Sequence, residues 1–239
     1  MRGLWWAFAV AGLHAIQTPG SFHAGEAVAR DGERWLALRV DTRSARLEAT
    51  RLRVIAVADP IGDAPGEQTG QDVRAETGGE AIVFLRGPLL RPGPVQQALS
   101  ENQKADQKAG TLPEQIFALG ERRYRLRTYC EAHAATGDIV GAAGALDCRI
   151  ELSEGGKRQT LLSVSGRRET TFPDAPIVLG DDATPIVIFA GDLDRDGRLD
   201  LVFDTTDHYN LARPTLFLSG AAGKGELLRE MAKYSAVGC

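Results

Sequence analysis

One acidic segment of the sequence has residue types and spacing that suit a metal ion. Residues 192–200, DLDRDGRLD, place carboxylates at positions 1, 3, 5 and 9 and a glycine at position 6. Calcium prefers about six to eight oxygen ligands, and a glycine at the sixth position allows the sharp turn of such a loop. Four carboxylates this close would repel one another without a cation. We therefore predict that the loop binds Ca²⁺ through the side chains of Asp192, Asp194, Asp196 and Asp200 and the backbone carbonyl of Arg198.

The surroundings of this loop differ from those of an EF-hand. Its twelfth position is Phe203, where an EF-hand has a bidentate glutamate, and both flanking segments read as strands rather than helices. The run GDLDRDGRLDLVFD, from Gly191 to Asp204, resembles the calcium loops of FG-GAP and VCBS repeats. That resemblance implies a β-loop-β unit that holds calcium in a protein outside the cytoplasm. The alternative is a metal-free turn in which the aspartates bond the backbone.

A second polar segment, DTTDHYN, covers Asp204 to Asn210. An acid–base role for His208 with Asp207 would make it the centre of a hydrolase beside the metal loop. We favour a turn whose polar side chains bond the backbone and brace the loop. The sequence has no zinc spacing, no H-E-x-x-H, no G-x-S-x-G and no phosphate-binding glycine loop, so no catalytic residue is predicted.

Arginines alternate along a predicted strand at residues 122–131. Arg123, Arg125 and Arg127 lie on one face, and Tyr124, Leu126 and Cys130 on the other. We interpret the arginines as the solvated face of an amphipathic strand rather than as an anion site.

The rest of the sequence predicts the elements that must position these residues. With 43% hydrophobic and 25% charged residues, the chain has the composition of a globular protein. We predict a mainly β fold with antiparallel sheets, as a sandwich or a partly open barrel, and few short helices. Residues 225–234 suggest a short helix or turn, and residues 92–113 a short helix or mobile connection. Apolar, alternating runs predict strands at residues 34–40, 47–57, 81–85, 122–131, 148–153, 159–164, 185–190, 199–203 and 215–219.

The first 29 residues are typical of a signal peptide. Arg2 precedes an apolar run over residues 3–16, and Ala27-Val28-Ala29 suits cleavage near Ala29. A buried N-terminal helix is the alternative. We predict export to the periplasm or the medium, with no transmembrane anchor after cleavage. The remaining chain divides into an N-terminal β region, 30–110, and a C-terminal β region with the calcium loop, 111–239, which can also form one domain.

The three cysteines predict one disulfide in an oxidising compartment. We favour Cys148–Cys239, because a terminal cysteine serves as a tether, and this leaves Cys130 as a buried thiol. The alternative is Cys130–Cys148, which requires their two strands to be neighbours and would contribute ~3 kcal/mol.

Charge and composition limit the partners. A net charge of −4 gives no electrostatic reason for nucleic-acid binding. Together with the signal peptide and the acidic loop, this leads us to expect an exported calcium-binding protein without enzymatic activity that recognises an unknown protein or polysaccharide. The alternative is the hydrolase.

Overall fold

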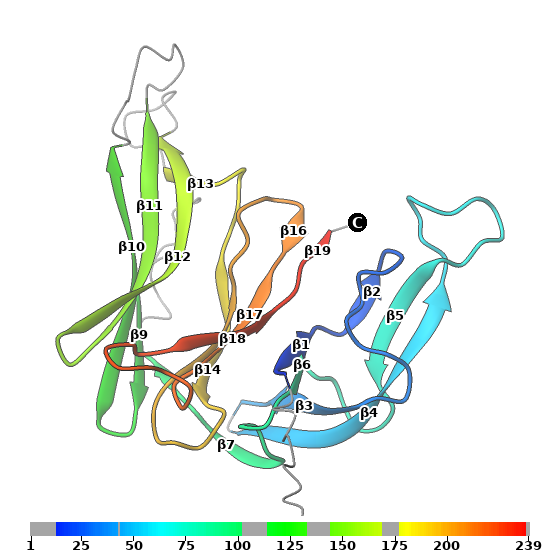
Figure 1. The fold of residues 1–239 in the computed structure, drawn as a ribbon, viewed down its shortest axis with the longest axis horizontal. Helices are drawn as coiled ribbons and strands as arrows, with labels where there is room; N and C mark the ends of the chain where they lie inside the picture. The colour runs from blue at the N-terminus through cyan, green and yellow to red at the C-terminus, as the bar shows by residue number, and fades with distance from the viewer. Residues whose placement is uncertain (1–12, 43, 102–113, 133–143, 169–176, 238–239) are drawn as a thin grey trace, which may run out of the picture.

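The computed structural model describes residues 13–42, 44–101, 114–132, 144–168 and 177–237, and these form an all-β protein (Figure 1). Paired strands run antiparallel, which confirms the predicted fold class. The predicted short helices are wrong within these residues, which contain no helix and so none that could cross a membrane. Residues 229–233 form a strand where a short helix or turn was expected over residues 225–234, and two strands occupy the described part of residues 92–113, where a short helix or mobile connection was expected.

The strands are short and closely spaced along the chain. They are β1 (Ala15–Gln17), β2 (Gly20–Phe22), β3 (Arg34–Val40), β4 (Ala45–Val57), β5 (Gly70–Ala75), β6 (Val83–Arg86), β7 (Gly93–Gln97), β8 (Leu99–Ser100), β9 (Gln115–Leu119), β10 (Arg122–Ala132), β11 (Ala145–Glu154), β12 (Lys157–Arg168), β13 (Ile177–Leu179), β14 (Ile186–Asp192), β15 (Asp200–Asp204), β16 (Leu211–Ala212), β17 (Pro214–Leu218), β18 (Arg229–Lys233) and β19 (Ala236–Val237).

The fold contains two large sheets. An 11-stranded sheet runs β1-β6-β3-β4-β7-β14-β15-β17-β18, with β5 and β2 attached through β4, and curls into a nearly closed barrel. Its ends meet because β1 lies beside β17 and β18. A six-stranded sheet, β13-β12-β11-β10-β9-β8, forms a half-barrel beside it. Strand β7 pairs with β4 and β14, so the larger sheet continues across the two predicted regions.

The strands β14, β15 and β17 lie between two hydrophobic cores. Val202 and Leu216 face the core of the barrel, whereas Leu201, Phe203 and Phe217 face the core under the six-stranded sheet. A strand buried on both faces needs a continuous apolar run, which explains the unbroken Leu-Val-Phe of β15. The acidic loop joins β14 to β15, so two strands that lie between the cores hold its two ends.

The N-terminal strands are built into the barrel. Strand β1 pairs with β6 and β2 pairs with β5, while Ile16 is only 1% exposed. The backbone N–H of Thr18 donates to the hydroxyl of Tyr234 at 3.2 Å, which links the beginning of the barrel to its end. Cleavage near Ala29 would remove both strands and uncover the core surface beneath them.

The disulfide joins Cys130 to Cys148, so the favoured pairing of Cys148 with Cys239 is wrong. Strands β10 and β11 are neighbours, and their register places the two cysteines directly opposite each other with Cα atoms 4.1 Å apart. Cys130 is therefore not a free thiol, and Cys239 lies outside the described residues.

Candidate metal centre

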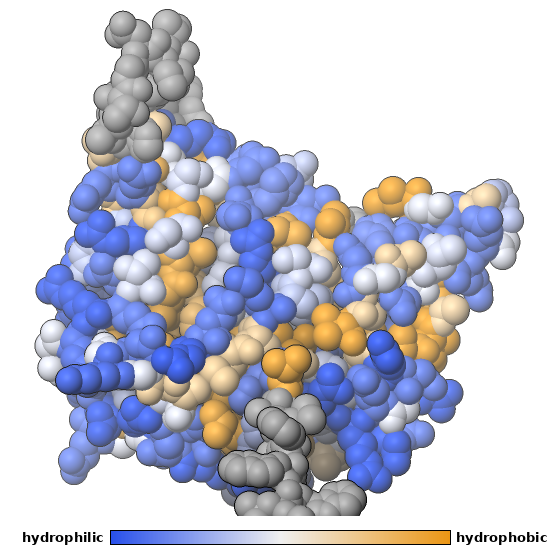
Figure 2. All heavy atoms as spheres, viewed as in Figure 1, coloured by the Kyte–Doolittle hydropathy of each residue, from blue (hydrophilic) through white to orange (hydrophobic). Residues whose placement is uncertain are grey.

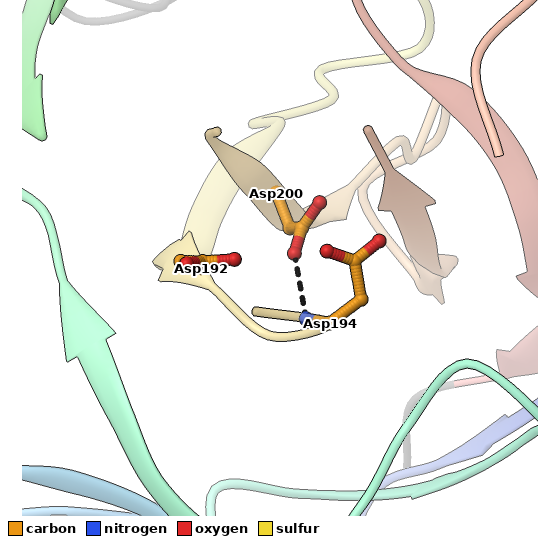
Figure 3. Close-up of side chains that lie close together, drawn as sticks. All are labelled: Asp192, Asp194 and Asp200. Atoms are coloured by element: carbon orange, nitrogen blue, oxygen red, sulfur yellow. Dashed lines mark hydrogen bonds between the residues drawn. The ribbon is translucent and has the colours of Figure 1, made fainter. Parts of the chain in front are cut away.

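Three of the predicted ligands converge at the end of the central strands. Each of Asp192, Asp194 and Asp200 offers one carboxylate oxygen, and these atoms lie within 4.8 Å of one another. Figure 3 shows the three carboxylates pointing into the space enclosed by the loop. Asp192 is 7% exposed and Asp200 is fully buried. The cluster thus consists only of oxygen donors and could hold a metal ion.

Backbone conformation gives the loop its tight curvature. Gly197 has φ of +78°, as expected for the sharp turn, and Arg195 also adopts a positive φ of +64°. The Asp192 carboxylate accepts hydrogen bonds from the backbone N–H groups of Asp196 and Gly197, both at 3.0 Å. The first aspartate therefore organises the turn while remaining within the cluster.

Asp200 holds the loop together from the opposite side. One of its oxygens accepts the N–H groups of Leu193 at 2.6 Å and Asp194 at 3.1 Å. The other accepts the backbone N–H and the hydroxyl of Ser219 at 2.7 and 3.0 Å. Burial raises the pKa of Asp200 to about 8, and the charge of Asp194 raises it as well. The hydrogen bonds from Ser219 and Asp194 act in the opposite direction and lower the pKa. Because both oxygens receive donors, the geometry suits the ionised carboxylate, and that form needs a nearby cation.

Asp194 completes the cluster from the turn itself. Its carboxylate accepts the N–H of Gly220 at 2.9 Å, and a Cβ on Gly220 would lie 2.4 Å from the same oxygen. Glycine at position 220 is therefore needed for this close approach. Burial raises the pKa of Asp194, and the charges of Asp196 and Asp192 raise it further.

Asp196 lies outside the three-carboxylate group. Its carboxylate accepts the Arg198 Nε at 2.8 Å and lies 2.9 Å from the Ser219 hydroxyl, whose single proton it shares with Asp200. Arg198 also donates from its guanidinium to the Ser219 carbonyl at 2.9 Å. The structure thus uses Asp196 and the Arg198 side chain to tie the loop to the β17–β18 turn, and their roles as calcium ligands stay predictions.

Several residues that support the loop lie far from it in sequence and were missed. Ser219 and Gly220 bind the carboxylates from the turn after β17. Arg195 donates to the carbonyl of Pro94 at 3.2 Å, and the hydroxyl of Tyr124 accepts the N–H of Leu199 at 3.3 Å. No local sequence pattern predicts these contacts, because only the tertiary fold brings the residues close to the loop.

The segment from Asp204 to Asn210 bonds mainly into its own turn. The His208 Nδ1 accepts the Asn210 N–H at 3.0 Å, and its Nε2 lies 3.1 Å from the exposed Asp181. Asp207 binds Arg213 at 2.9 Å, which lowers the pKa of Asp207. Three cavities of the described structure are lined by residues from the ranges 34–90, 116–158 and 147–165. None of the three is lined by a residue of the Asp204–Asn210 segment. These contacts fit a bracing turn better than an acid–base pair facing a substrate.

Comparisons of the chain with family models, curated proteins and solved structures found no match. The resemblance of the loop to FG-GAP and VCBS repeats therefore stays a prediction.

Proposed function

We propose that the Asp192–Asp200 loop binds Ca²⁺ and that the ion serves a structural role in an exported binding module. One observation carries the proposal: three carboxylates, two of them buried, meet within 4.8 Å. No Lys or Arg side chain in the described part of the chain lies within 4 Å of these three carboxylates. Such a group is stabilised by a cation that neutralises it.

The chemistry of the donors favours a hard divalent ion. The cluster offers carboxylate oxygens and includes neither histidine nor cysteine, which argues against zinc and copper. Calcium accepts irregular oxygen coordination, whereas Mg²⁺ requires a nearly ideal octahedron and retains its water. The irregular turn around Arg195 and Gly197 therefore suits Ca²⁺ better.

The bound ion would join two turns of the protein. Asp194 and Asp200 already bond to Gly220 and Ser219 of the β17–β18 turn, so an ion between the carboxylates fixes the β14–β15 loop against that turn. Binding to the folded state alone stabilises it by mass action. A fixed loop that supports a surface for a protein or polysaccharide is consistent with a binding module without enzymatic activity.

Calorimetric titration of the metal-free protein with Ca²⁺ and with Mg²⁺ tests the proposal. We expect saturable calcium binding that is stronger than magnesium binding and is lost in Asp194→Asn. Asp181→Asn is the matched control, because Asp181 is exposed and pairs only with His208 among the described ion pairs. Absence of calcium-dependent heat in the wild-type protein, or an unchanged affinity in Asp194→Asn, would refute the proposal.

A further inference from the structure

A cavity of about 330 Å³ opens beside the tight turn between β11 and β12. It lies at the end of the six-stranded sheet and is separate from the carboxylate cluster. Figure 2 shows that the lower left of the molecule, where Figure 1 places the β11–β12 turn, is mostly hydrophilic. Residues of β9, of β10 and of the β11–β12 turn line it, among them Ile116 and Tyr124.

Four cationic side chains line this cavity. Arg123 and Arg125 come from β10, and Lys157 and Arg158 come from the start of β12. The antiparallel register explains the meeting, because Arg125 lies opposite Ser153 and Ser153 lies opposite Arg158. Lys157 and Arg158 are exposed, and neither forms an ion pair with a residue that the structure describes.

The nearby carboxylates do not balance this charge. Glu154, which also lines the cavity, pairs with Arg122 at 3.0 Å. Glu101 pairs with Arg123 at 2.9 Å, and Glu114 lies 3.7 Å from Arg125. Of the four cationic side chains that line the cavity, Arg123 and Arg125 have carboxylate partners, whereas Lys157 and Arg158 pair with none of the residues that the structure describes, so two positive charges are left without a partner. A bound anion would reduce the resulting repulsion.

The neighbouring arginine behaves differently. Arg127 lies outside the cavity lining, within 3.6 Å of Glu114, and its guanidinium stacks over the ring of Tyr129. The interpretation as a solvent-exposed strand face therefore holds for Arg127. Arg123 and Arg125 instead lie beside the cationic side chains at the start of β12.

The turn leaves room for a ligand. Gly155 and Gly156 have φ of +54° and +85°, and no atom lies within 4 Å of where a Cβ would stand on either. The backbone of the turn is thus open to solvent beside the cationic side chains. Guanidinium groups match the oxygens of phosphate and sulfate well, since they donate two parallel hydrogen bonds.

We propose that this cavity binds an oxyanion group, phosphate or sulfate, either free or as an ester on a polysaccharide. Lys157 and Arg158 supply its unpaired cations, and Arg123 and Arg125 flank the bound group. The site requires neither the carboxylate cluster nor a bound metal.

Calorimetric titration of the full chain with inorganic phosphate and with inorganic sulfate, at low and at high sodium chloride, tests the proposal. We expect saturable binding that weakens with salt and falls at least about tenfold in Lys157→Gln/Arg158→Gln. The control is Arg46→Gln/Lys224→Gln, which removes the same charge from exposed positions away from the cavity. Equal binding by the two double variants, or no saturable binding to the wild type, overturns the proposal.

A second comparison separates the sources of the anion. A sulfated polysaccharide and the same polysaccharide without sulfate are titrated against the wild type and Lys157→Gln/Arg158→Gln. Tighter binding of the sulfated chain than of inorganic sulfate, lost in the variant, identifies the ester as the ligand. Equal affinity for inorganic sulfate and the sulfated chain identifies the free anion. Equal binding of sulfated and unsulfated chains overturns the proposal, because recognition would then not depend on the oxyanion.

Discussion

The metal-free protein is expected to lose stability as the pH rises, because its buried Asp200 resists ionisation. Burial raises the pKa of Asp200 to about 8, whereas an aspartate in an unfolded chain titrates near about 4. The folded state therefore binds the proton more tightly, so the contribution to stability is complete below the unfolded pKa and is lost as the pH rises through the folded pKa. One pKa unit corresponds to about 1.4 kcal/mol, which gives a loss of about 3–4 kcal/mol between pH 5 and pH 8.

Bound Ca²⁺ is expected to cancel this loss, because the ion favours the ionised carboxylate. Urea unfolding at pH 5 and pH 8, with metal-free protein and with millimolar calcium, measures the free energy of unfolding in each state. Tryptophan fluorescence reports the transition, since Trp35 is buried in the barrel core. The decline with pH should appear in the metal-free protein and be small with calcium.

Asp200→Asn is the reference for this experiment. Its amide group would face backbone N–H donors, so the variant is less stable at every pH, but it has no carboxyl to titrate at position 200. Three other groups also make the protein less stable as the pH rises. The hydrogen bond to Asp59 raises the pKa of His23, and burial raises the pKa values of Asp194 and Asp204. They remain in the variant, so the difference between the two proteins isolates Asp200. Equal pH dependence in both would refute the reasoning.

Three further predictions concern other parts of the molecule. Deletion of residues 2–29 should abolish the cooperative unfolding transition, because it removes β1 and β2. Deletion of residues 2–12, which leaves both strands in place, is the control and should preserve the transition. A 2–29 deletion that still folds would contradict the role assigned to these strands. Cys130→Ser should lower the free energy of unfolding by ~3 kcal/mol, and alkylation of the denatured, unreduced wild type should modify one of its three cysteines. Gly220→Ala should weaken calcium binding at least about tenfold in calorimetry, because its Cβ would displace a cluster carboxylate, while Gly223→Ala meets mainly flexible side-chain ends and should bind as the wild type does.

The sequence pattern predicted those features that depend on local spacing. Alternating aspartates with Gly197 indicated the carboxylate cluster, and three of the four aspartates meet there. Alternation in β10 predicted which side chains face the core, since Tyr124 and Leu126 are buried and the neighbouring arginines are exposed. Both signals follow from the geometry of a turn or a strand, which a short stretch of sequence specifies.

Features that depend on distant neighbours could not be predicted in the same way. Residues 225–234 have the spacing of an amphipathic helix, but β18 forms there because it supplies hydrogen bonds to the open edge of β17. The disulfide follows from the register of β10 against β11, which a cysteine count leaves undetermined. Ser219 reaches the cluster only through the pairing of β15 with β17.

The contact of Tyr234 with Thr18 has a consequence for how the molecule reaches its native state. These residues are separated by 216 positions, and they join the first and last strands of the barrel. Ring closure must therefore await synthesis of nearly the whole polypeptide, and the high contact order of such a topology slows folding. The barrel of the nascent chain therefore stays open until the segment that carries Tyr234 is available to close it.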